Sequence, residues 1–152
     1  MKKLLLLAVI FTSSFLTAQR TGDMPYIHHF GINQVQEGSG AHYKIRNGDE
    51  NDIVIALTNH ETGEVVAHAF IESGHKYTFF NLPIGSYTYK FSNAGDYFKD
   101  EEPVELKGCD STKYLCDLEN HQYERSLKVW VTTSRGSKGK SRKITKDEFF
   151  SN

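Results

Sequence analysis

The sequence is poor in the residues and phrases on which most enzyme classes depend. It has only two cysteines and one tryptophan in 152 residues. It lacks the G-x-S-x-G phrase of serine hydrolases, a P-loop, a dinucleotide-binding fingerprint and an H-E-x-x-H metal phrase. A second cysteine pair that would complete a zinc site is also absent. We therefore predict a protein that is not an enzyme, with no catalytic residue, no metal site and no cofactor.

Long apolar runs are confined to the N-terminus. Lys2 and Lys3 precede the apolar run 4–11, and a polar stretch then ends at Ala18. This order is typical of a secretory signal peptide, here residues 1–18. The run is shorter than the roughly 20 residues that span a bilayer as a helix. We expect an exported chain, periplasmic or secreted, with no membrane-spanning segment.

The two cysteines lie close together in the sequence. Cys109 and Cys116 are separated by six residues. In a chain sent to an oxidising compartment such a pair is expected to form a disulfide. Closing so short a loop stabilises the fold by roughly 2–3 kcal/mol in the loop-entropy model. We predict a structural disulfide rather than a redox-active one.

Beyond the signal peptide, short β-rich runs recur without a helical apolar period. About seven short strands with frequent turns predict an all-β sandwich. Its single domain is assigned to residues 42–133, after an N-terminal extension of residues 19–41. The expected strands are 43–46, 53–58, 65–72, 77–81, 87–92, 103–107 and 126–133. The run 53–57 is apolar on both faces, which predicts a central strand.

Residues 53–97 contain a longer pattern: a strand, a T-G-x-V-V hairpin, then G-x-x-Y-x-F-x-N-L-P-x-G-x-Y. This pattern resembles the Cna-B or carboxypeptidase-regulatory-like family, the prealbumin-like β-sandwiches. The resemblance implies an immunoglobulin-like or prealbumin-like fold and no particular activity. Where isopeptide-forming members carry an assisting glutamate, this chain has Lys90, so no such bond is implied. The matching residues are Thr62, Gly63, Val65, Val66, Gly74, Tyr77, Phe79, Asn81, Leu82, Pro83, Gly85 and Tyr87, followed by Gly95 and Tyr97.

Four of these residues are predicted to shape turns rather than to bind a ligand. Thr62 and Gly63 would form a hairpin turn, and Pro83 and Gly85 a tight link between two strands. We expect Gly85 to need a positive φ, which residues other than glycine adopt only at a cost.

Charge is distributed unevenly. Residues 19–133 hold 10 basic and 17 acidic residues, whereas residues 134–152 hold 6 basic and 2 acidic. Glycine and serine accompany the basic residues, which predicts a flexible, solvated tail. The alternative is an electrostatic arm for an anionic surface or an acidic partner. Nucleic acid is not expected as a partner of an exported acidic body. The basic residues of this arm are Arg135, Lys138, Lys140, Arg142, Lys143 and Lys146.

Histidines and carboxylates suggest further sites, each with a simpler interpretation. The histidines are scattered and favour surface positions over a metal site. The acidic residues of 47–52 favour a solvated turn over a loose calcium site, and those of 96–105 favour a charged edge strand. The histidines are His28, His29, His42, His60, His68, His75 and His121.

Six aromatic residues exceed what a small core obviously needs. They could stack on sugars or anchor a protein partner, or they could fill the ends of the sandwich. These residues are Tyr26, Phe30, Tyr77, Tyr97, Tyr114 and Tyr123.

These observations together favour an exported, non-catalytic β-sandwich that acts as a binding or interaction module at the bacterial cell envelope. Its expected partner is an unidentified protein, a glycan or an anionic envelope surface. The alternatives are a small secreted hydrolase and a purely structural envelope protein.

Overall fold

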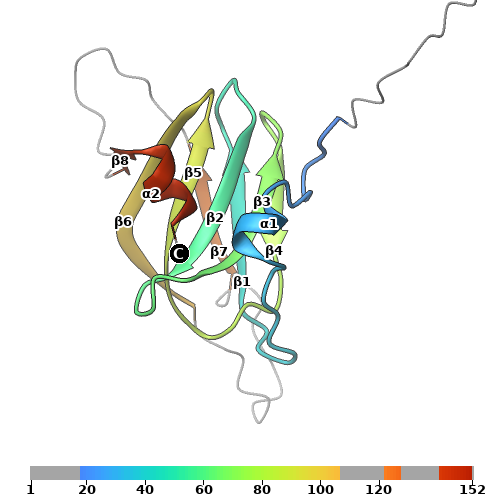
Figure 1. Cartoon of the computed structure of the whole chain (residues 1–152). Helices are drawn as coiled ribbons and strands as arrows, with labels where there is room; N and C mark the ends of the chain where they lie inside the picture. The colour runs from blue at the N-terminus through green and yellow to red at the C-terminus, as the bar shows by residue number, and fades with distance from the viewer. Residues whose placement is uncertain (1–17, 107–121, 128–140, 152) are drawn as a thin grey trace, which may run out of the picture.

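The computed structural model describes residues 18–106, 122–127 and 141–151, and for Glu101 and residues 122–127 it describes the backbone alone. The described strands form two sheets, so the predicted all-β sandwich is confirmed (Figure 1). The five-stranded sheet has the order β3 (Val65–Ile71), β2 (Ile53–Asn59), β5 (Gly85–Asn93), β6 (Asp96–Leu106), β8 (Ser141–Ile144). The three-stranded sheet has the order β4 (Lys76–Phe79), β1 (His42–Asn47), β7 (Gln122–Leu127). The β1–β7 pair is parallel, and the other pairs are antiparallel.

The main core lies between the two sheets, and β2 lies between β3 and β5 in the larger one. Ile55 and Leu57 of β2 are buried in this core together with Tyr43 and Ile45 of β1. Ala56 points to the opposite face and belongs to a second buried cluster. A strand buried on both faces must be apolar at successive positions, which is why residues 53–57 have no alternation.

The N-terminal extension is hydrogen-bonded to the outer edge of β3. Every second residue from Val66 to Phe70 is hydrogen-bonded to it, so the extension takes the place of a neighbouring strand. The bonds join Gly22 and Asp23 to Phe70, the side chain of Asn33 to His68, and Gln34 to Val66, at 2.8–3.2 Å. An edge that would otherwise expose its backbone groups is thereby covered.

Residues 141–151 also belong to the folded domain. β8 pairs with β6 from Tyr97 to Asp100, and α2 (Lys146–Phe150) buries Phe149 completely, at 0% exposure. The predicted flexible tail is therefore wrong for these residues, and so is a domain boundary at residue 133. The average composition of residues 134–152 is polar, which hides the few apolar side chains that attach the segment to the sheet.

Both short helices lie on the outer face of the five-stranded sheet, α1 (Ile27–Phe30) over β3 and α2 over β6 (Figure 1). Aromatic rings of α1 and of Tyr26, which directly precedes it, meet rings of α2 edge to face. The centroids are 4.9 Å apart for Tyr26 and Phe150 and 5.7 Å for Phe30 and Phe149. Tyr97 of β6 joins them, 4.9 Å from Phe149. We call these five residues the aromatic cluster. Three of the six surplus aromatics of the sequence are thus used in packing.

The four predicted turn residues behave differently from one another. Gly63 has a φ of +78° in the β2–β3 turn, where Thr62 donates its backbone N–H to the side chain of Asn59. Gly85 begins β5, and its φ lies outside the left-handed region. The expected positive φ at Gly85 is therefore wrong, because the chain reverses earlier, at Asn81 with a φ of +52°. The Pro83 carbonyl accepts a hydrogen bond from the hydroxyl of Tyr87 instead.

Several predicted features lie outside the described residues. They are the disulfide between Cys109 and Cys116, the signal peptide up to residue 17, and the basic residues Arg135, Lys138 and Lys140. Among the described residues, no helix is long and apolar enough to cross a membrane.

Candidate functional site

The outer face of the five-stranded sheet carries a line of basic side chains. Ala56 of β2 is paired with His68 on one side and Lys90 on the other, Lys90 with Lys99, and Lys99 with Arg142. Directly opposite residues on neighbouring strands project from the same face. We call His68, Lys90, Lys99 and Arg142 the basic row.

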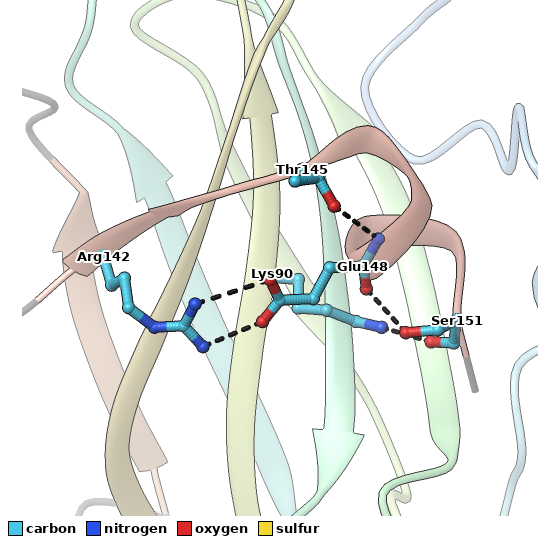
Figure 2. Close-up of polar contacts among 5 residues, drawn as sticks. All are labelled: Lys90, Arg142, Thr145, Glu148 and Ser151. Atoms are coloured by element: carbon cyan, nitrogen blue, oxygen red, sulfur yellow. Dashed lines mark hydrogen bonds and ion pairs between the residues drawn. The ribbon is translucent and has the colours of Figure 1, made fainter.

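The C-terminal helix α2 lies on this row and neutralises part of it. Arg142 and Glu148 form an ion pair of 2.8 Å, and Lys90 donates from Nζ to the backbone carbonyl of Ser151 at 2.6 Å (Figure 2). Thr145 caps the helix by accepting from the N–H of Glu148. The amine of Lys90 also lies 5.8 Å from the centroid of the Phe30 ring. Lys143 pairs with Asp96 at 2.8 Å, so Arg142 and Lys143 of the predicted tail both form ion pairs within the protein.

Burial and crowding perturb the titration of this region. Desolvation, and then the charge of Lys99, lower the pKa of Lys90 to about 8. The hydrogen bond from Arg142 holds the pKa of Glu148 below its usual value. Burial also lowers the pKa of His68, which keeps that ring neutral near pH 7.

A lysine with a pKa near 8 resembles the activated amines of lysine-dependent enzymes. The side chain of Lys90 is, however, only 4% exposed and lies beneath the protein's own aromatic cluster. No substrate carbon can approach the amine in this arrangement. We assign Lys90 a structural role, that of holding the end of α2 on the sheet.

An open groove lies on another side of the sandwich, between the N-terminal extension and β4. Its volume is about 210 Å³, and we call it the β4 groove. It is lined by Asn33, Gln34, Val35, Ala67, Tyr77, Thr78, Phe79, Phe80 and Leu82. The extension supplies one wall through residues 33–35, while β4 and the link that follows it supply the other.

Exposed apolar side chains are concentrated around the β4 groove. Among the described residues, five large apolar side chains are exposed, and four of them lie in the segments that border the groove. These four are Ile32 (73%), Val35 (62%), Phe80 (66%) and Ile84 (52%). Gln36 ties the two segments together, since its side-chain oxygen accepts from the N–H of Ile84 and its own N–H donates to Asn81. Such a local concentration is typical of an interaction surface.

The other sites suggested by the sequence take on structural roles. Asp100 is 1% exposed and accepts from the hydroxyl of Tyr89 at 2.5 Å. β8 pairs with β6 from Tyr97 to Asp100, so this part of the acidic stretch is not the charged edge strand that the sequence predicted. In the 47–52 loop, Asn47 bonds to the carbonyls of Asn51 and Ile71, and Asp49 accepts from Asn93.

Within the described ranges, no three His, Cys, Asp or Glu side chains come together as metal ligands. His121 lies outside those ranges.

Sequence reasoning missed the residues that make the β4 groove conspicuous. Phe79 and Phe80 are adjacent and chemically identical, yet Phe79 is 3% exposed and Phe80 66%. Only the end of β4 at Phe79 separates them. Tyr77 is the one residue of this groove that the surplus of aromatics had indicated.

Comparison with known proteins gave no further assignment. No protein family, no curated protein and no solved structure matches this chain.

Proposed function

We propose that the protein is an exported, non-catalytic β-sandwich that acts as a binding module at the bacterial cell envelope. Its binding surface is the β4 groove. The observation that carries the proposal is the gathering of Val35, Phe80 and Ile84, all more than half exposed, around a concave surface. Water-exposed apolar side chains on both sides of a groove are stabilised when a partner covers them.

Two features of the sequence support this proposal. The basic and apolar N-terminal segment supports export. The pattern of residues 53–97 resembles the Cna-B or carboxypeptidase-regulatory-like sandwiches, a resemblance that implies a fold and no particular activity. The buried setting of Lys90 is in keeping with a non-catalytic role.

The proposal is tested by screening the purified chain against glycan arrays, peptide libraries, envelope fractions and chromogenic hydrolase substrates. Any ligand found is then measured with Phe80→Ala and with the matched control Ile27→Ala, which truncates an exposed apolar residue in α1. We expect Phe80→Ala to weaken binding at least tenfold and Ile27→Ala to leave it within twofold.

Three outcomes contradict the proposal. Turnover of a chromogenic substrate would favour the small secreted hydrolase. Retention in the envelope fraction that does not depend on Phe80 would favour a structural envelope protein. A ligand whose affinity Phe80→Ala leaves unchanged would place binding elsewhere.

A further inference from the structure

We infer that the occupant of the β4 groove is an extended peptide segment of a partner protein, which adds to β4 as a fourth strand of the smaller sheet. This inference rests on the proposed function and specifies its ligand class. The segment would carry apolar side chains toward the groove and acidic side chains on the opposite face.

The pairing of β4 with β1 determines which of its backbone groups remain at the outer edge. Asn47 of β1 donates its N–H to the carbonyl of His75 at 2.9 Å, so the pair Asn47–His75 is a hydrogen-bonded pair. Such pairs alternate along an antiparallel ladder. Tyr77 and Phe79 are therefore the β4 residues bonded to β1, whereas the backbone groups of Lys76 and Thr78 point away from it.

The neighbouring edge strands β3 and β4 differ in whether the N-terminal extension covers them. β3 and β4 follow each other in the chain, and each is an edge strand of its sheet. The extension bonds to β3 at alternate residues, from Val66 to Phe70, and to the residue after the strand, Glu72. Among the residues that the structure describes, none gives a backbone hydrogen bond to Thr78. One edge is covered, and the other keeps its bonding groups facing the groove.

The alternation of side chains is the third argument. A strand added to β4 would place successive side chains on opposite faces. One set would face Ala67, Tyr77 and Leu82 in the groove. The other set would lie beside the outer face of β1 and β4, where Arg46 is paired with Lys76 and Lys44 with Thr78.

Charge decides between a foreign strand and a second copy of this chain. Each ionisable side chain on the outer face of β1 and β4 is basic or histidine: His42, Lys44, Arg46 and Lys76. Pairing two β4 edges would place this basic face, with Lys76 nearest the edge, beside the same basic face of a second copy, and like charges that come close across paired strands repel. An acidic partner strand avoids this repulsion. Strand addition at a free edge is a general mode of peptide recognition.

The inference is tested with a phage-displayed library of random dodecapeptides, from which enriched peptides are synthesised and measured by fluorescence anisotropy. We expect enrichment of alternating apolar and acidic residues and depletion of proline. Methylation of alternate backbone amides in a selected peptide should weaken binding at least tenfold, because those amides bond to the β4 edge.

The matched variants are Thr78→Pro and Thr78→Val. Proline removes the outward N–H at an edge position where no bond to β1 is lost, whereas valine keeps the N–H and the β-branched shape. We expect at least a tenfold loss for Thr78→Pro and less than twofold for Thr78→Val. Should Thr78→Pro fail to fold, the methylated peptides still decide the question with the unaltered protein.

Several results would overturn the inference, and they separate it from the proposed function. Selected peptides that tolerate methylation at every amide would exclude strand addition. A glycan that binds with dependence on Phe80 would preserve the proposed function and refute the peptide ligand. A dimer detected by sedimentation, and lost in Thr78→Pro, would replace the foreign strand with a second copy. Absence of any ligand would refute both.

Discussion

Replacing Lys90 with methionine tests whether this amine is a buried charge held on the sheet at a cost. Methionine has a similar length and no charge, so it fills the space beneath the aromatic cluster without requiring desolvation of an ammonium group. In the wild type, burial and then Lys99 lower the pKa of Lys90 to about 8, from an ordinary value of 10.5. The difference between these two pKa values sets the expected dependence of stability on pH.

The direction in which the free energy of unfolding changes with pH follows from proton binding. Between pH 8 and 10.5 the unfolded chain holds the Lys90 proton more tightly than the folded chain, so the free energy of unfolding rises with pH in this window. The buried charge costs about 3 kcal/mol at pH 7 and about 1.4 kcal/mol at pH 9.5. The wild type should therefore gain about 2 kcal/mol between these pH values from this residue alone.

The assay is urea denaturation of the wild type and Lys90→Met at intervals from pH 7 to 9.5, with subtraction of the two free energies at each pH. Loss of the bond to Ser151 removes about 1–3 kcal/mol at every pH and offsets part of the gain at pH 7. The pH-dependent part of the difference is free of that offset. The control is Lys146→Met, which replaces an exposed lysine in the first turn of α2.

A wild-type-minus-variant difference that stays constant over this pH range would refute the reasoning. It would mean that water reaches the amine and that its pKa is close to that of a free lysine.

Further predictions concern packing, turns and the cysteines. Phe149→Ala removes a fully buried ring and should lower the free energy of unfolding by about 3–5 kcal/mol, measured by thermal or urea unfolding. An unchanged midpoint would show that α2 does not pack on the core. Gly63→Ala should cost about 1–2 kcal/mol, because its φ is +78°, whereas Gly85→Ala should change stability by less than about 1 kcal/mol. Equal effects at both sites would contradict these backbone assignments. Mass spectrometry of non-reduced peptides should show Cys109 and Cys116 joined, with two hydrogens lost; free thiols in exported protein would exclude the bond.

The sequence was informative where a local pattern determines a strand. Residues 53–57 are apolar at successive positions, and β2 is an interior strand, paired on both sides and buried on both faces. Residues 65–71 follow a turn with a glycine and became β3 in the expected place. In both segments the apolar sequence alone predicts a buried strand, and the fold places a buried strand there.

The sequence was uninformative where a partner lies far away in the chain. α2 has five residues, too few for an apolar period to be recognised, and Phe149 is buried only because α1 and β6 lie beneath it. The β4 groove has the same origin, since its walls come from residues 33–35 and from β4. Asn33 shows the difficulty most simply: nothing local indicates that its amide bonds to both backbone groups of His68.

The aromatic cluster also constrains how this chain acquires its structure. Its rings come from residues 26–30, from β6 and from α2, so Tyr26 finds Phe150 only after the strands between them have formed. Contacts between residues so distant in the sequence slow folding, because the intervening chain loses its freedom before they stabilise it. During synthesis the part of the outer face that α2 covers would remain uncovered until residues 141–151 emerge. A chain lacking residues 141–151 would expose rings of the aromatic cluster that α2 otherwise covers, and exposed apolar surface of this kind favours aggregation.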